Sequence, residues 1–290
     1  MNKYIKQTAL LILPALLVTA CDEAYIMDDL QTESGITIEG LVTNLPGRQF
    51  VKVSRSTDFY ASGKTPRITD ATVQVSDNVG NTYTYVHNPG GHADSVGYYK
   101  PAIPFVGQVG RTYSLTVQAD GQTYTASDEM FHINPIDELE FELDQDQVDE
   151  PEDEDFPNRI YEVLMSVEEP QETRDYYLFR TYRNGERIWS ESSEDDPEIY
   201  VTDDVLVGGE IKDIAIPGYF ENGEVAGAEI YSLSRPVFIF YRDLSKILAN
   251  DGGMFDPPPA NPRSNISNNA FGLFQASAIS YREVRIEAAE

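Results

Sequence analysis

The sequence predicts a mainly β protein: an N-terminal immunoglobulin- or transthyretin-like antiparallel sandwich, followed by a second mostly-β domain with one C-terminal amphipathic helix. The first observation behind this prediction is a period of two. From Gly35 onward, apolar and polar residues alternate as they do in strands that bury one face. The second is that short alternating runs are separated by turn residues over about a hundred positions, which favours a sandwich.

The sandwich is expected over residues 34–132, where recognisable turns separate the strands. Asp120-Gly121 is a favoured two-residue hairpin turn, and the residues from Asp77 to Asn81 form another turn. No helical periodicity interrupts this part of the sequence. The expected strands cover residues 36–42, 50–54, 71–76, 82–86, 112–119 and 122–126.

The second domain is expected over residues 133–290, and the period changes near its end. Between Val237 and Leu248, apolar residues recur on one face at a spacing of about 3.6 residues. With Pro236 at a suitable first position, they predict a helix near 236–249 whose apolar face packs into the core. The expected strands cover residues 139–143, 159–167, 175–182, 186–189, 199–206, 211–216 and 228–233, with one or two more within 271–286.

The first 20 residues predict a lipoprotein signal peptide. Two lysines precede a short apolar run, and small residues follow it, as at a secretory cleavage site. The run is too short to span a membrane. Val18, Thr19 and Ala20, followed by Cys21, resemble the bacterial lipobox. That resemblance implies a diacylglycerol and a fatty acid such as palmitate on Cys21, whereas the alternative is a plain signal peptide in which Cys21 is incidental.

Residues 21–33 are expected to form an acidic tether. Asp22 and Glu23 directly follow the cysteine, and Asp28 and Asp29 come soon after. Acidic residues at this place resemble the surface-export signal of Bacteroidota lipoproteins, which implies a lipid-anchored protein of the outer membrane that faces the cell surface. A solvated tether without an export role is the plainer alternative.

Charge and cysteine content exclude several classes of protein. The chain has 49 Asp and Glu against 21 Lys and Arg, a net charge of −28. Nucleic-acid binding and docking of a basic patch onto anionic lipid both need clustered cations, so neither is expected. A single cysteine excludes an intramolecular disulfide and a cysteine-based zinc site.

Catalytic motifs are missing from the sequence, so no catalytic residue is assigned and a non-enzymatic protein is expected. Ser62-Gly63-Lys64-Thr65 lacks the upstream glycine of a P-loop, because Asp58 occupies that position. The three histidines lack the spacing of a zinc protease, and no transition metal is expected. A carboxylate-dependent hydrolase remains the less favoured alternative, because abundant acids give no way to identify a catalytic pair.

Two weak candidate sites lie in polar segments. Asp144, Asp146, Asp149 and Asp153 carry oxygen ligands of the kind that calcium takes, but they lack the register of an EF-hand. A solvated acidic loop without calcium is the favoured interpretation. Ser95, within Asp94-Ser95-Val96, resembles a Bacteroidota O-glycosylation site in a surface loop.

Trp189 is the best single candidate for ligand contact. It follows a predicted hairpin turn and precedes an acidic segment over 191–198. An aromatic face at such a place stacks on a sugar ring, although packing across strands is the favoured interpretation for an aromatic residue in a β protein.

A set of short motifs occurs in a fixed order along the chain: Cys21, Ile38 to Asn44, Ala71 to Val73, Gly80 to Tyr83, Gly107 to Tyr113, Pro135 to Asp137, Phe255 to Pro259, Asn265-Ile266 and Phe271 to Phe274. In this order the motifs resemble the Bacteroidota outer-membrane lipoprotein family known as domain of unknown function 4249. Members of this family look like lipoproteins encoded beside TonB-dependent receptors. The resemblance therefore implies a non-enzymatic accessory subunit of a TonB-dependent uptake system, with such a receptor as its partner and a glycan or peptide as cargo. The alternative is a stand-alone glycan-binding or adhesive surface lipoprotein.

Overall fold

The structure is a computed structural model that describes residues 35–56, 65–149, 157–168, 175–188, 199–204, 210–248 and 261–287. Residues 34–290 form one compact unit. The lipobox, Cys21, the tether, Asp153 and Trp189 all lie outside the described residues. The predictions made for them stay predictions.

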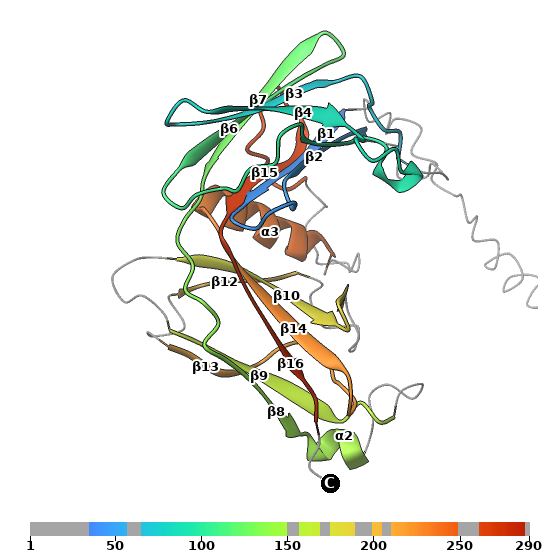
Figure 1. The fold of residues 1–290 in the computed structure, drawn as a ribbon, viewed down its shortest axis with the longest axis vertical. Coiled ribbons are helices and arrows are strands. Elements are labelled where there is room, and N and C mark those ends of the chain that lie inside the picture. Colours follow the sequence, from blue (N-terminus) through green and yellow to red (C-terminus); the bar gives the residue numbers. More distant parts are fainter. Residues whose placement is uncertain are drawn as a thin grey trace, which may run out of the picture. The chain divides into compact units, whose positions relative to one another are not determined.

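The mainly β prediction is confirmed, but the first sheet is built differently from the expected sandwich. Eight strands form one near-closed, barrel-like sheet in the order β15-β1-β2-β5-β4-β3-β6-β7 (Figure 1). β15 runs parallel to β1, whereas the other neighbours are antiparallel. The strands are β1 (Ile36–Thr43), β2 (Phe50–Arg55), β3 (Thr72–Asp77), β4 (Thr82–His87), β5 (Tyr98–Pro101), β6 (Thr112–Ala119), β7 (Gln122–Glu129) and β15 (Phe271–Ser277).

Alternating side chains explain why these segments form one curved sheet around a core. In β6, Tyr113, Leu115 and Val117 are buried, and the residues between them are exposed or half-buried. Gly272 allows β15 to lie beside β1: its φ is +96°, and a Cβ at this position would collide with the carbonyl oxygen of Ile38. The sequence prediction assigned this strand to the second domain, because a period of two does not reveal which sheet a strand joins.

Two smaller sheets pack against each other through a second core. One has the order β11-β10-β14-β16, with β12 also paired to β10, and the other has the order β13-β9-β8. Their shared core includes Val163, Met165, Tyr177, Phe220 and Ile230. The strands are β8 (Glu138–Leu143), β9 (Tyr161–Glu168), β10 (Tyr176–Arg183), β11 (Glu186–Arg187), β12 (Tyr200–Asp203), β13 (Glu210–Ala215), β14 (Val225–Ser232) and β16 (Ile279–Arg285).

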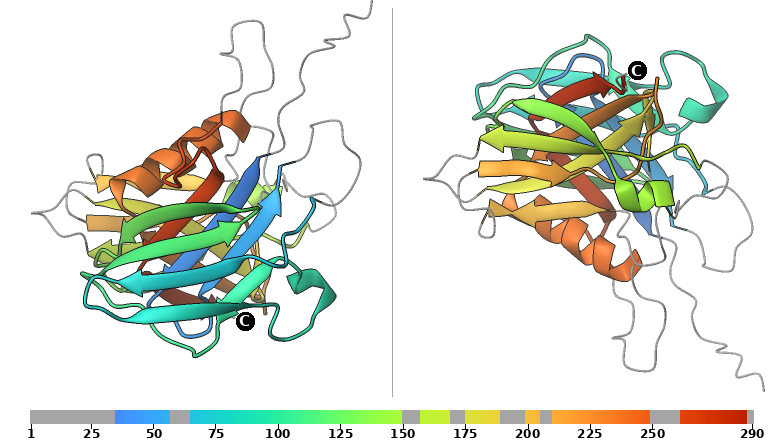
Figure 2. Two further views of the ribbon diagram at one scale, coloured as in Figure 1. Left: turned by 90° about the horizontal axis from the view of Figure 1, so that it is seen from above. Right: turned by 90° about the horizontal axis from the view of Figure 1, so that it is seen from below.

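The predicted C-terminal helix is confirmed as α3 (Arg235–Leu248), which lies alongside the strands (Figure 2). It contacts β10 and β12 of the second sheet and β15 of the first. Val237 and Phe238 are buried, whereas Leu248, which was expected on the packed face, is 49% exposed. The only other helices among the described residues are a 3-10 turn, η1 (Ala93–Ser95), and the short α2 (Gln145–Asp149). None of the described helices is long and apolar enough to cross a membrane.

A buried ion pair connects the loop after β1 to the second sheet. Arg48 pairs with Glu229 of β14, whose side chain is fully buried. The Glu229 carboxylate also accepts hydrogen bonds from the hydroxyls of Tyr182 and Tyr231, both at 2.7 Å. Burial raises the pKa of both tyrosines, so both stay protonated and able to donate. The charge of Glu229 is therefore compensated by three donors on two parts of the fold.

Asp128 lies where the first sheet almost closes. It is buried at the end of β7, and one of its carboxylate oxygens accepts the Ala276 N–H of β15 at 2.7 Å. Burial raises the pKa of this carboxyl to about 7, even though the hydrogen bonds favour the charged form. We therefore expect the contact between β7 and β15 to depend on pH.

Replacement of Asp128 by Asn should remove a pH dependence of stability. An unfolded Asp titrates near pKa ~3.9, so the folded state binds the proton more tightly and is most stabilised by this group below about pH 4. That stability is lost as the pH rises toward the folded pKa of about 7. As the pH rises from 4 to 8, the free energy of unfolding of Asp128→Asn, measured by urea titration, should therefore increase relative to that of the wild type by on the order of 3 kcal/mol. If the variant and the wild type differed in free energy of unfolding by the same amount at both pH values, the raised pKa of Asp128 would be contradicted.

Replacement of Arg48 by Met should destabilise the fold strongly, even though the Arg48 side chain is itself half-exposed. The substitution leaves the buried Glu229 charge with only its two tyrosine donors. We expect a loss of about 3 kcal/mol in the free energy of unfolding, because an uncompensated buried charge is costly.

The matched control is Arg55→Met. Arg55 pairs with Asp120 at 2.6 Å, but the two side chains are 42% and 40% exposed. Exposed pairs contribute about 1 kcal/mol or less, so this variant should stay close to the wild type in the same urea titration. If Arg48→Met and Arg55→Met lost the same free energy of unfolding, the burial of Glu229 would not increase the cost of removing its partner.

Candidate functional site

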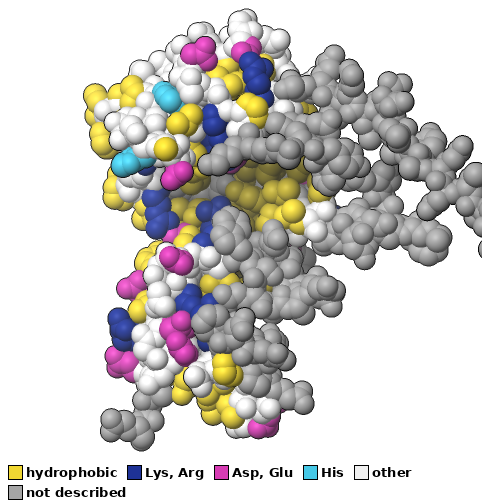
Figure 3. Space-filling model, turned by 90° about the vertical axis from the view of Figure 1, so that its right-hand side faces the viewer, with side chains coloured by type: hydrophobic (Ala, Val, Ile, Leu, Met, Phe, Trp, Pro, Cys, Tyr) yellow, Lys and Arg dark blue, Asp and Glu magenta, His cyan; other side chains and the backbone are white. Residues whose placement is uncertain are grey.

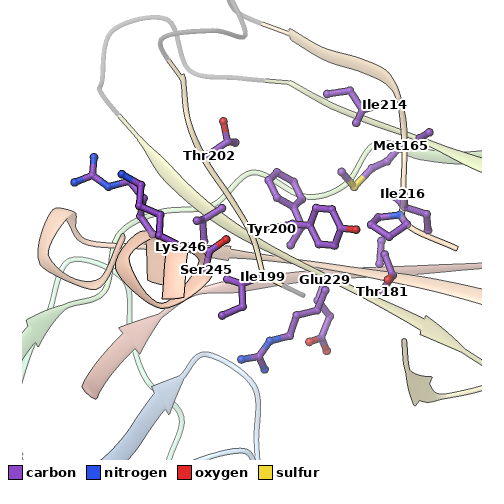
Figure 4. A pocket seen from close by; sticks show the side chains of 17 residues that line it. Met165, Thr181, Ile199, Tyr200, Thr202, Ile214, Ile216, Glu229, Ser245 and Lys246 are labelled. Atoms are coloured by element: carbon purple, nitrogen blue, oxygen red, sulfur yellow. The ribbon is translucent and has the colours of Figure 1, made fainter. Parts of the chain in front are cut away.

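A cavity of about 480 Å³ lies where β10, β12, β13, β14 and α3 meet (Figure 4). Its walls are mainly apolar and include Met165, Phe179, Ile199, Ile214 and Ile216. This volume is within the usual range of about 300–1,000 Å³ for small-molecule sites, which also combine apolar walls with a few polar groups. The cavity is the best candidate for a binding site among the described residues.

The pairing of β10 explains why a cavity forms at this place. β12 pairs with Tyr176–Phe179, and β11 pairs with Tyr182–Arg183, so Arg180 and Thr181 lie between the two partner strands. Thr181 faces Ala228 in the neighbouring strand β14. Both side chains are small, and they therefore leave space above this part of the sheet.

A bulge in β13 shapes the opposite wall. The register with β9 shifts between Ile211 and Ile214, and Asp213 within it has a φ of +49°. Asp213 is held by Ser166, whose hydroxyl accepts its N–H at 3.2 Å. Beyond the bulge, Ile214 lines the cavity and remains 44% exposed. The bulge therefore leaves a large apolar side chain at a solvent-accessible part of the wall.

The charged residues that line the cavity are mostly cations. Arg180 comes from β10, and Arg242 and Lys246 come from α3. Glu229 is the one acid among the described lining residues (Figure 4), and its carboxylate pairs with Arg48, which lies outside the cavity lining. In a chain with a net charge of −28, this is a local excess of positive charge.

Contacts with Tyr231, which is not a lining residue of the cavity, hold the Arg180 side chain in place. Its guanidinium lies 4.6 Å from the centre of the Tyr231 ring and donates to the Tyr231 hydroxyl at 3.0 Å. Its buried Nε has no hydrogen-bond partner in the described part of the chain. Arg180 therefore contributes a fixed positive charge.

A second, more polar hollow of about 400 Å³ lies beside the first sheet. It is lined by Arg48, Lys100 and three tyrosines, and it also includes Ser95. On the face of the molecule in Figure 3, hydrophobic side chains gather near the middle, and basic and acidic side chains are both spread around them. Ser95 is half-buried at the end of η1, and its glycosylation stays a prediction.

The candidate calcium ligands have a structural role that the sequence prediction did not include. Asp144 caps α2: its Oδ1 accepts the N–H groups of Asp146 at 2.8 Å and Gln147 at 3.3 Å. Asp149 accepts a hydrogen bond from Gln145 at 3.3 Å. Within the described ranges, no group of three or more His, Cys, Asp or Glu side chains is arranged to hold a metal ion. Calcium binding that involves Asp153 stays a prediction.

The cavity residues were missed by sequence reasoning. Arg242 and Lys246 stand four residues apart on the predicted helix, and this spacing places two cations on one face. This spacing is the feature of the sequence that could have indicated these two cavity residues. Arg180 and Ile214 carry no comparable signal, because only the pairing of β10 and the bulge in β13 bring them to the cavity.

Comparison with known proteins identifies the family. None of the curated proteins matches the chain significantly. The family model described as "Domain of unknown function (DUF4249)" matches residues 23–283. This match covers strands of all three sheets and the cavity, and it confirms the resemblance drawn from the sequence motifs. The chain belongs to the DUF4249 family.

Proposed function

We propose that this protein is a surface-facing outer-membrane lipoprotein and a non-enzymatic, ligand-binding accessory subunit of a TonB-dependent uptake system. The observation that carries the binding role is the apolar cavity of about 480 Å³ between β10, β13 and α3. Such a cavity buries a small ligand on several sides. The predicted acylation of Cys21 would hold the body beside the receptor, and the cavity would present the cargo.

The charged groups of the cavity support binding over hydrolysis. A glycosidase needs two carboxyl groups on either side of the scissile bond, about 5–9.5 Å apart. The described lining residues include one acid, Glu229, whose carboxylate is engaged by Arg48, Tyr182 and Tyr231. A carboxylate held in this way is poorly placed to act on a ligand.

A stand-alone glycan-binding lipoprotein is the second candidate function. The polar hollow beside the first sheet favours it, because Tyr98, Tyr182 and Tyr231 line this hollow together with Arg48 and Lys100. Aromatic rings beside polar groups are suited to sugars. Trp189, on this proposal, would add a further ring.

We also propose that the eight-stranded sheet is related to immunoglobulin- or transthyretin-like sandwiches. Its antiparallel hairpins, such as β6 with β7, support this relation. The boundary expected near residue 133 would then separate the two domains, with β15 returning to complete the first sheet.

Purification of the lipidated protein from outer membranes in mild detergent tests the accessory role. We expect a TonB-dependent receptor to co-purify with the wild type. Cys21→Ala should remove the acyl chains and release the protein from the membrane fraction, which membrane fractionation measures. Arg55→Met, a change of one exposed charge outside the cavity, should leave both results unchanged. Recovery of the wild type as a lone monomer would contradict the proposal.

A further inference from the structure

We infer that the cavity beside α3 binds a small organic anion with an apolar body and one acidic headgroup. This inference rests on the proposed binding function and names the chemical class of the ligand. It comes from one juxtaposition: apolar walls on β9, β12 and β13 adjoin a pair of cations on α3.

The walls select the body of the ligand. Met165 and Ile216 are buried at the base of the cavity, and Ile214 remains partly exposed at its wall (Figure 4). Burial of such apolar surface by a ligand is favourable in proportion to the area removed from water. An aliphatic or aromatic body therefore fits these walls better than a sugar, which needs many hydrogen-bonding partners.

The headgroup is selected by Arg242 and Lys246. They stand one helical turn apart on α3 and both line the cavity. Both side chains are exposed, and no ion pair with an acid is formed by either of them among the described residues. A carboxylate headgroup at this end of the cavity would lie beside two cations. It would therefore be stabilised there more than a neutral or a cationic headgroup.

The remaining charges reinforce this selectivity. Arg180 adds a third positive charge, fixed against the Tyr231 ring. Glu229 does not offset it toward the cavity, because its carboxylate accepts from Arg48 and two tyrosine hydroxyls. The described lining therefore offers positive charge to a ligand and no free carboxylate.

Three probes with one tail and different headgroups test the inference: dodecanoate, 1-dodecanol and dodecyltrimethylammonium. Isothermal titration calorimetry on the full chain measures their affinities, below the micelle concentration of the two ionic probes and below the solubility limit of 1-dodecanol. We expect dodecanoate to bind at least about fivefold more tightly than dodecyltrimethylammonium, as two partly exposed ion pairs would give. The double variant Arg242→Gln/Lys246→Gln keeps only Arg180 as a cation in the described lining, so it should lose most of this preference and keep its affinity for 1-dodecanol.

Matched variants locate the site. Arg235→Gln removes one exposed cation from the same helix outside the cavity lining, and it should leave the preference unchanged. Ile214→Glu places a carboxylate on the wall, so it should weaken dodecanoate binding by about fivefold or more and weaken dodecyltrimethylammonium binding less. Ile214→Gln, of the same size without the charge, should bind both probes with the wild-type preference.

Three results would overturn the inference: equal binding of the three probes, no binding of any probe, or an equal effect of Arg235→Gln and the double variant. Each concerns the class of ligand and leaves the receptor co-purification untouched. Conversely, dodecanoate selectivity with no co-purifying receptor would support the anion site and contradict the accessory role.

Discussion

The passage of the chain from β15 to β16 through a single residue, Ala278, is the constraint on which the rest of the structure depends. β15 completes the first sheet beside β1, and β16 pairs with β14 in the second sheet. Ser232 fixes this joint: its hydroxyl accepts the Ala278 N–H at 3.1 Å and donates to the Phe131 carbonyl at 2.8 Å. Asn44 binds both backbone groups of Ile279, its amide donating at 3.2 Å and its oxygen accepting at 2.8 Å. Residues from four separate stretches of the chain therefore meet at one point.

The buried Glu229 is a second connection between the same two sheets, and it also affects the cavity. A carboxylate in this position needs donors from both sides, so the loop that carries Arg48 has to stay against β14. Tyr231 donates to Glu229 and at the same time accepts from Arg180. The compensation of one buried charge thus fixes a cation at the edge of the cavity. On the proposed anion-binding role, stability and ligand selectivity would be coupled through the Tyr231 hydroxyl.

The local elements were predictable from the sequence, whereas their assembly was not. Alternation and turn residues placed most strands within a few residues, and the spacing of apolar residues placed α3. The sequence placed β15 in the second domain and gave it no partner strand, because its pairing with β1 joins residues more than two hundred positions apart. The acidic stretch from Asp144 was expected to be a solvated loop, yet its first residue caps a helix, as an aspartate before a short helical run often does.

The same distinction explains why the cavity was not predicted. A cavity is a property of what neighbouring strands leave unfilled, and here it depends on a divided edge of β10, a bulge in β13 and small residues at Thr181 and Ala228. None of these has a sequence motif. The net charge of −28 is also no guide to the cavity, because it describes the whole chain. Ligand selectivity is set by the groups that face the ligand at short range. At this cavity the described charges are three cations and one acid already compensated by Arg48, so the local field opposes the average of the chain.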